Sequence, residues 1–71
     1  MGNYINRIMQ GEQINCYSDN YPSNYYNIRY SNQTGMFIEK EYHNGALIET
    51  LSLNIEDVQS IIETSDHIHI K

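Results

Sequence analysis

The clearest pattern in the chain is an alternation of apolar and polar residues on both sides of Asn44-Gly45. An Asn-Gly pair between two such runs predicts a β-hairpin, because a type I′ turn needs a positive φ at both of its central residues. A two-residue turn places Tyr42 opposite Leu47, and the pairing continues from there without interruption. One face of the hairpin then collects the apolar side chains of Met36, Ile38, Tyr42, Leu47, Leu51 and Leu53. The other face is mostly polar and carries Phe37, Glu39, Glu41, His43, Ile48, Thr50 and Ser52.

A second alternating run, residues 25–31, predicts a strand that precedes the hairpin. With a four-residue loop, Tyr26, Ile28 and Tyr30 would share the mostly polar face of the hairpin. A five-residue loop, or a bulge with Gly35 at positive φ, instead moves all three to the apolar face. We favour the second register because it buries more apolar area. In that register the mostly polar face gains Tyr25, Asn27 and Arg29, with Arg29 opposite Phe37.

The hairpin is followed by signals for a helix. Asn54 is a good N-cap, and the acidic residues of the next turn are favoured by the helix dipole. Apolar residues recur at helical spacing and predict that the helix covers the apolar face of the sheet and stops near Thr64-Ser65. These residues are Ile55, Val58, Ile61 and Ile62. Residues 66–71 alternate again and predict a short terminal strand.

The first third of the chain is less strongly patterned. Residues 4–9 have helical spacing that Gly11 could end, although a short strand is the competing interpretation. Residues 12–17 alternate and predict a strand, and residues 18–24 predict a loop. Together these elements predict one α+β domain over residues 1–71. It consists of a small antiparallel meander of three to five strands, with one helix from the C-terminal half packed on one face.

Length and composition narrow the class of protein. The chain has 71 residues, and no apolar run approaches the ~20 residues that cross a bilayer. The single Cys excludes an internal disulfide, and the start of the chain has no signal-peptide pattern, so we expect a cytoplasmic protein. Because a chain this short buries only about 60% of its surface, we also expect a homodimer or higher oligomer.

The charge balance bears on the kind of partner. The formal net charge is −5, with only 4 Lys and Arg in the whole chain. This argues against nucleic acid, because nucleic-acid binders gain affinity by replacing counterions with Lys and Arg. Seven Tyr on an acidic chain are instead typical of an adaptable protein interface. We therefore expect a protein partner with a basic surface.

Few residues suggest chemistry. Cys16 and His43 could form a nucleophile and base, but Cys16 is in phase with Ile14, which predicts a small buried thiol. His67 and His69 lie on one strand face, but a zinc site needs at least one further ligand that no motif supplies. The glycines are isolated and form no phosphate-binding loop. We expect no metal, no cofactor and no enzymatic activity.

The mostly polar face of the sheet is the candidate binding surface. We expect a small acidic binding protein of the kind that phages and mobile elements encode to evade host defences, which inhibits or regulates a host protein by occupying its site. A competing hypothesis is an oligomer that sequesters a nucleotide, with stacking and a phosphate contact from Tyr25, Tyr26, Arg29 and Phe37. A weak single-stranded nucleic-acid-binding module and a structural assembly subunit are two further hypotheses. The candidate residues are Tyr25, Tyr26, Arg29, Phe37, Glu39, Glu41 and His43.

Overall fold

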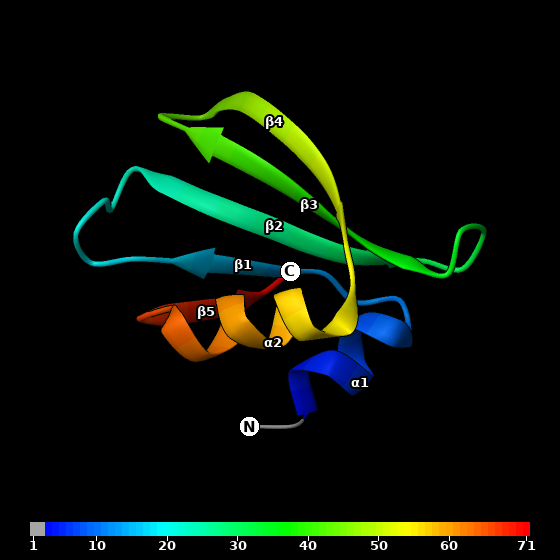
Figure 1. Cartoon of the computed structure of the whole chain (residues 1–71). Helices are drawn as coiled ribbons and strands as arrows, with labels where there is room; N and C mark the ends of the chain where they lie inside the picture. Colours follow the sequence, from blue (N-terminus) through cyan, green and yellow to red (C-terminus); the bar gives the residue numbers. More distant parts are fainter. Residues whose placement is uncertain (1–2) are drawn as a thin grey trace.

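The computed structural model describes residues 3–71, which form two helices and a five-stranded antiparallel sheet (Figure 1). The strands lie in the order β4-β3-β2-β1-β5, so β1 to β4 form a meander and α2 carries the chain across the sheet to β5. This confirms the expected α+β fold, and the N-terminal helix agrees with the helical interpretation of residues 4–9 rather than with the short strand. The elements are α1 (Asn3–Met9), β1 (Ile14–Tyr17), β2 (Asn24–Ser31), β3 (Met36–His43), β4 (Ala46–Leu53), α2 (Ile55–Thr64) and β5 (His67–Ile70).

Both helices pack on the same face of the sheet, which we call the helix-side face (Figure 1). Their buried side chains join those of four strands in one apolar core. The opposite side of the sheet, which we call the open face, has no helix on it. The core consists of Ile8, Ile14, Cys16, Ile28, Phe37, Leu53, Val58 and Ile62.

The hairpin between β3 and β4 has the predicted turn but not the predicted register. Asn44 and Gly45 have φ angles of 52° and 84°, and Tyr42 pairs with Leu47 as expected. Beyond that pair the register shifts by one residue, which leaves Ile48 as the extra residue of a β-bulge. A shift of one residue brings the side chains of β4 to the other face of the sheet relative to those of β3. The predicted set of β3 and β4 side chains that share each face is therefore wrong.

The bulge brings the apolar residues of β4 onto the same face as a different set of β3 residues. Leu53 lies opposite Phe37, and Leu51 lies opposite Glu39. The expected pairing of these leucines with Met36 and Ile38 is wrong. The arrangement joins Phe37 and Leu53 to the core, and it places Glu39 and Glu41 on the helix-side face.

The loop between β2 and β3 also differs from our expectation. Ser31 pairs with Met36, so the loop has four residues, although Gly35 does have the expected positive φ, at 71°. Arg29 therefore lies opposite Ile38 rather than Phe37, and Tyr30 lies opposite Phe37. The four-residue loop is favoured because it stacks the apolar residues of β2 on the same face as Phe37, where the helices cover them.

Helix α2 follows the prediction closely. The Asn54 side chain accepts a hydrogen bond from the Asp57 backbone N–H at 2.9 Å, and the Asp57 carboxylate accepts one from the Asn54 N–H, which completes a capping box. The helix ends at Thr64, with Ser65 as its C-cap. Of the predicted apolar stripe, Val58 and Ile62 are buried, whereas Ile55 is exposed.

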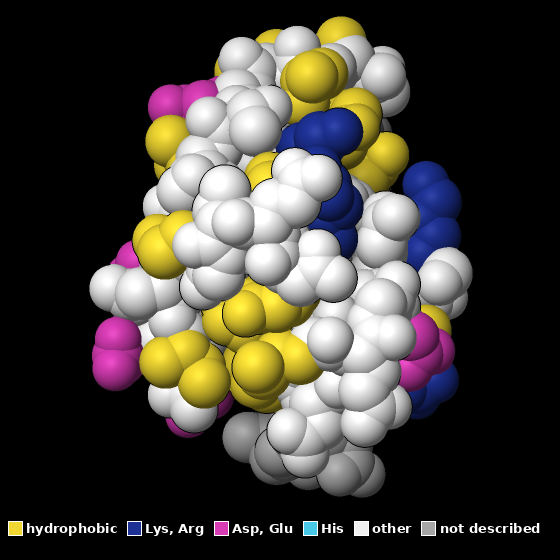
Figure 2. Space-filling view, turned by 90° about the vertical axis from the view of Figure 1, so that its right-hand side faces the viewer, with side chains coloured by type: hydrophobic (Ala, Val, Ile, Leu, Met, Phe, Trp, Pro, Cys, Tyr) yellow, Lys and Arg dark blue, Asp and Glu magenta, His cyan; other side chains and the backbone are white. Residues whose placement is uncertain are grey.

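The sheet separates its charges onto opposite faces. The strand carboxylates Glu39, Glu41 and Glu49 share the helix-side face, whereas the strand cations Arg29 and Lys40 lie on the open face. Figure 2 looks at one end of the sheet and shows most of the acidic side chains along one edge of the view and basic ones in its centre and along the other edge. The molecule is therefore acidic overall but locally basic on one side.

Candidate functional site

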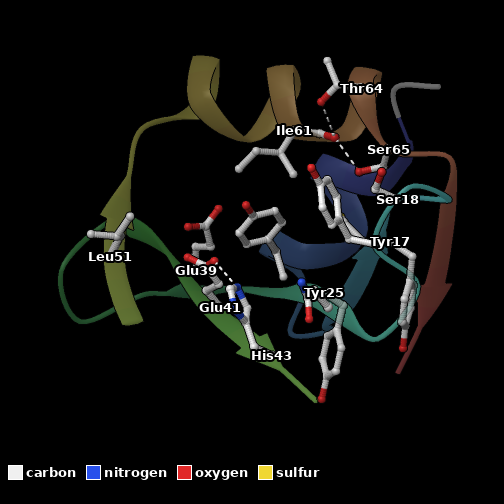
Figure 3. Close-up of a pocket in the computed structure, with 14 residues that line it drawn as sticks. Tyr17, Ser18, Tyr25, Glu39, Glu41, His43, Leu51, Ile61, Thr64 and Ser65 are labelled. Carbon is white, nitrogen blue, oxygen red and sulfur yellow. Dashed lines mark hydrogen bonds and ion pairs between the residues drawn. The ribbon is translucent and has the colours of Figure 1, made fainter. Parts of the chain in front are cut away.

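A groove lies on the helix-side face, between the end of α2 and strands β2 to β4 (Figure 3). Its volume is about 660 Å³. The groove exists because α2 covers only part of a sheet that continues to β4, where seven of the eight residues are exposed. The lining residues are Cys16, Tyr17, Ser18, Tyr21, Asn24, Tyr25, Tyr26, Glu39, Glu41, His43, Leu51, Ile61, Thr64 and Ser65.

Glu39 lies on the floor of this groove. It stands between Ile28 on β2 and Leu51 on β4, and only 6% of its surface is exposed. No other residue of the described chain, 3–71, gives its carboxylate a hydrogen bond or an ion pair. Its oxygens nevertheless retain some contact with solvent at the groove. In Figure 3 the carboxylate points from β3 into the space below Ile61 of α2.

The surroundings of Glu39 disfavour its negative charge. Burial raises the pKa of the Glu39 carboxyl above its ordinary value, and repulsion by Glu41, Glu49 and Asp57 raises it further. Burial and the same acidic strand residues also raise the pKa of the Tyr26 phenol. The groove is thus a region of negative potential with a carboxylate that lacks a counterion.

Glu41 and His43 form the outer part of the same acidic strip. The His43 Nε2 lies 2.5 Å from the Glu41 Oε2, and both side chains are partly exposed. Two residues apart on one strand, they face the same side of the sheet as Glu39. A cation that entered the groove would therefore meet Glu41 and His43 first and Glu39 at the end of its path.

Cys16 closes the inner end of the groove. It is 1% exposed, and burial raises the pKa of its thiol to about 11. A thiol this buried remains protonated near neutral pH and is a poor nucleophile. The predicted role of Cys16 as a small core residue is confirmed.

The structure brings four of the seven candidate residues together in the groove: Tyr26, Glu39, Glu41 and His43. Tyr25 also borders the groove, but its ring stacks on that of Tyr42, on the open face. Arg29 lies on the open face, and Phe37 is buried in the core, so neither reaches the groove. The mostly polar surface that we predicted is therefore divided between two faces and the core.

Sequence reasoning missed the groove residues contributed by α2 and β4. The pattern predicts that Ile61 and Leu51 are packed between the helix and the apolar face of the sheet. In the structure Leu51 is 41% exposed, and both residues line the groove. The missed signal is the adjacent pair Leu47-Ile48, which breaks the alternation of β4 and marks the bulge.

The histidines of β5 do not join a metal site. His67 Nε2 lies 2.7 Å from the Asp19 carboxylate, and the His69 ring packs against Tyr17. Within residues 3–71, no group of three or more His, Cys, Asp or Glu side chains is arranged to hold a metal ion. In the same part of the chain, neither helix has the length and apolar character that a membrane crossing requires.

Comparison with known proteins adds no assignment. No protein-family model matches the chain, and no curated protein or solved structure is significantly similar to it. The functional conclusions below therefore depend on the geometry of the chain itself.

The uncompensated charge of Glu39 predicts an unusual dependence of stability on pH. Because its pKa is higher in the folded chain than in the unfolded chain, the folded state binds this proton more tightly. Its contribution to stability is complete below the ordinary pKa of 4.5 and is lost as the pH rises through the folded-state pKa. The E39Q variant cannot ionise at this position, so we expect it to lose less stability than wild type between acidic and neutral pH.

This expectation can be measured by urea unfolding between pH 4 and pH 8. The matched control is E63Q, which neutralises an exposed carboxylate on the outer side of α2. We expect E63Q to follow the wild-type pH curve. We expect E39Q to diverge from that curve as the pH rises from the ordinary glutamate pKa through the folded-state pKa of Glu39, and to stay above it at higher pH. If E39Q and wild type change in parallel over this range, Glu39 is not an unpaired buried acid.

Proposed function

We propose that this chain is a non-enzymatic binding protein whose groove holds a basic side chain of a partner protein and thereby blocks the partner's own binding site. The observation that carries the proposal is the carboxylate of Glu39, which is 6% exposed, lacks a partner within the described chain and points into the groove. A buried acid without a counterion costs stability, and proteins retain such groups mainly where they have a role.

The charge around Glu39 favours a cation as the ligand. Glu41 and Glu49 lie opposite each other on neighbouring strands and on the same face as Glu39. An arginine or lysine that entered the groove would relieve their mutual repulsion and form a charge-assisted hydrogen bond with Glu39. The planar guanidinium of arginine fits a partly buried carboxylate better than the strongly hydrated ammonium of lysine.

The apolar lining suits the rest of such a side chain. Leu51 and Ile61 border the groove on opposite sides of the Glu39 carboxylate (Figure 3). Long basic side chains bury their methylene stems on apolar surface while the charged end reaches a polar group. The combination of apolar walls and an acidic floor therefore favours a protein side chain over a small inorganic cation.

A protein that presents such a groove competes for basic surfaces of other proteins. Surfaces with exposed arginine and lysine commonly bind anions such as nucleic-acid phosphates. Occupying one of them would inhibit the partner, as expected for a small regulator encoded by a phage or mobile element. We place this interaction in the cytoplasm, where a reduced, unpaired cysteine such as Cys16 is common.

The four residues on which the nucleotide-sequestering hypothesis depends lie in different parts of the structure. Tyr25 and Arg29 lie on the open face, Tyr26 lies on the helix-side face and Phe37 is in the core. Within one chain these four side chains do not meet at one site, so we do not propose a nucleotide site formed by them.

A labelled peptide of alternating arginine and leucine provides a direct test of the groove. We expect wild-type protein to raise its fluorescence anisotropy, and the E39Q/E41Q variant to bind at least about tenfold more weakly, since charge-assisted hydrogen bonds in partly buried sites contribute ~1.5–3 kcal/mol. The same peptide with glutamine in place of arginine should not bind. Affinity capture from a host lysate with both proteins as bait would then identify a partner that depends on Glu39 and Glu41.

The matched control is E56Q/E63Q, which removes the same charge from exposed positions of α2. It should bind the peptide as wild type does, apart from a small change in association rate. If E39Q/E41Q and E56Q/E63Q lose the same amount of affinity, peptide binding depends only on the net charge of the protein. That result, or no binding by wild type, would refute the groove as the binding site.

A further inference from the structure

The open face of the sheet carries a row of aromatic side chains that crosses four strands. His69 on β5, Tyr17 on β1, Tyr25 on β2 and Tyr42 on β3 follow one another along this row. The ring centroids are 5.1 Å apart for His69 and Tyr17, 5.2 Å for Tyr17 and Tyr25, and 4.9 Å for Tyr25 and Tyr42. We call these four residues the aromatic row. Because each ring packs on the next, the row forms one ordered stripe across the sheet.

A neutral cluster of side-chain amides lies beside the aromatic row. Asn27, only 6% exposed, donates hydrogen bonds from its Nδ2 to the Asn15 Oδ1 at 2.8 Å and to the Gln13 Oε1 at 3.3 Å. The three amides come from β1, β2 and the residue just before β1. They form a fixed polar floor that adds no charge to the face.

Basic side chains border this floor. Lys40 lies opposite Asn27, and the Lys71 backbone N–H donates to the Gln13 carbonyl at 2.8 Å. A shallow depression of about 290 Å³ is lined by the two lysines, by two of the amides, Gln13 and Asn27, and by the rings of Tyr25 and Tyr42. Arg29 adds a third cation on the same face.

Within residues 3–71 the strands contribute no carboxylate to the open face, because every carboxylate at a strand position lies on the other face. The loop carboxylate of Asp19 at the edge of the open face lies 2.7 Å from His67. The fourth basic residue, Arg7, is paired with Glu12 at 2.6 Å. Three of the four basic residues of an acidic protein are thus gathered on one face.

We propose that the open face binds single-stranded nucleic acid, with phosphates on Lys40, Lys71 and Arg29 and bases against the aromatic row. Along the strands, the cations lie two or four residues away from the aromatic row, which is about 7–14 Å. One nucleic-acid strand can therefore contact both. Bases that lie over the row contact the edges and the hydroxyl groups of the rings. The contact between a ring edge and the face of a base is the T-shaped arrangement that aromatic pairs favour. Single strands bind proteins through this combination of aromatic groups and a basic surface.

The net charge of −5 does not prevent this binding. The acidic strand residues point to the opposite face of the sheet, away from a ligand that lies on Lys40 and Arg29. Screening over about 8 Å at physiological ionic strength further weakens their repulsion of phosphates on the open face. A duplex is a poorer ligand, since reading it requires a helix or narrow ribbon that enters a groove.

The probe is a labelled oligothymidylate of about twelve nucleotides, whose binding is followed by fluorescence anisotropy between about 50 and 200 mM salt. In a plot of the logarithm of the binding constant against the logarithm of the salt concentration, three phosphate contacts predict a slope of about −2. We expect K40Q and K71Q each to reduce this slope by about 0.7. We expect Tyr25→Leu to weaken binding at least about fivefold without changing the slope.

Two variants serve as controls. R7Q removes the same charge away from the open face and should leave affinity and slope unchanged. E39Q/E41Q should also bind the oligonucleotide as wild type does, so failure of the groove proposal and failure of this one remain distinguishable. Circular dichroism of each variant checks that the fold is intact. If Tyr25→Leu does not fold, Tyr42→Leu removes the neighbouring ring of the row and should weaken binding in the same way.

Three results would overturn the inference. The first is no anisotropy change with wild type at low salt. The second is equally tight binding of a duplex of the same length, or unchanged slopes in K40Q and K71Q. The third is self-association that K40Q abolishes in the absence of oligonucleotide binding, which would assign the basic face to the acidic groove of a second copy.

Discussion

Replacing Ile28 by alanine is expected to destabilise the protein by about 3–5 kcal/mol. Ile28 is 0% exposed and lies on the central strand β2, between Ile14 on β1 and Glu39 on β3. The substitution removes buried methyl and methylene groups and leaves a cavity that the surrounding strands fill only partly. A domain of this size has only about 4–10 kcal/mol of total stability, so Ile28→Ala removes a large part of it.

Thermal and urea unfolding measure this loss. We expect the melting temperature to fall by at least about 12 °C, since 1 kcal/mol corresponds to about 4–8 °C in a domain of this length. Ile48→Ala is the matched control, because Ile48 is the bulge residue and is 57% exposed. It should change stability by no more than about 0.5 kcal/mol. Similar losses at the two isoleucines would contradict the register and the core described above.

Labelling of the single cysteine is expected to show a second large effect. Cys16 is 1% exposed and the pKa of its thiol is raised to about 11, so the folded protein offers almost no accessible thiolate. We expect a chromogenic disulfide reagent to react at least about a hundredfold more slowly with the native chain than in concentrated urea. The native rate should follow the opening of the chain rather than the intrinsic reactivity of the thiol.

A destabilised variant shows whether the labelling rate is set by opening of the chain or by the intrinsic reactivity of the Cys16 thiol. In Ile28→Ala, the chain opens more often, so the labelling rate should rise by the same factor as the unfolded fraction. Rapid labelling of the wild-type protein that is independent of added urea would contradict the burial of Cys16 between α2 and the sheet.

Local signals were sufficient to predict most of the elements of this fold. The turn at Asn44-Gly45 and the cap at Asn54 act over a few residues, and both are found as predicted. The pairing of β5 with β1 joins residues at least fifty positions apart and had no local signal. The β3–β4 register failed for a related reason, since the bulge at Ile48 depends on which face the helices cover.

The candidate site was predicted less well than the fold. The pattern predicts Glu39 and Glu41 on the mostly polar face, opposite the face that the helix covers, and acidic residues on a strand are usually exposed. The structure instead buries Glu39 beside the core, because the bulge turns Leu51 and Leu53 to its side of the sheet. The overall charge also concealed the basic open face, since a net charge carries no information about which face holds each residue.

The two proposals assign opposite ligand chemistries to the two faces of one sheet. The acidic groove suits a basic protein side chain, and the open face suits a phosphate-bearing strand. Because the two surfaces lie on opposite sides of one sheet, each can be altered without removing the other. A partner that itself handles nucleic acid could engage both surfaces at once.

The most direct test of the groove is a nuclear magnetic resonance titration of ¹⁵N-labelled protein with the arginine–leucine peptide. We predict chemical-shift changes concentrated at residues 39–43 of β3 and at the end of α2, residues 61–65, that saturate with increasing peptide and are absent in E39Q/E41Q. Residues 13, 15 and 27, at the centre of the open face, should remain unchanged. Shifts scattered over the acidic surface, or shifts that persist in E39Q/E41Q, would contradict the groove as a specific site for a basic partner.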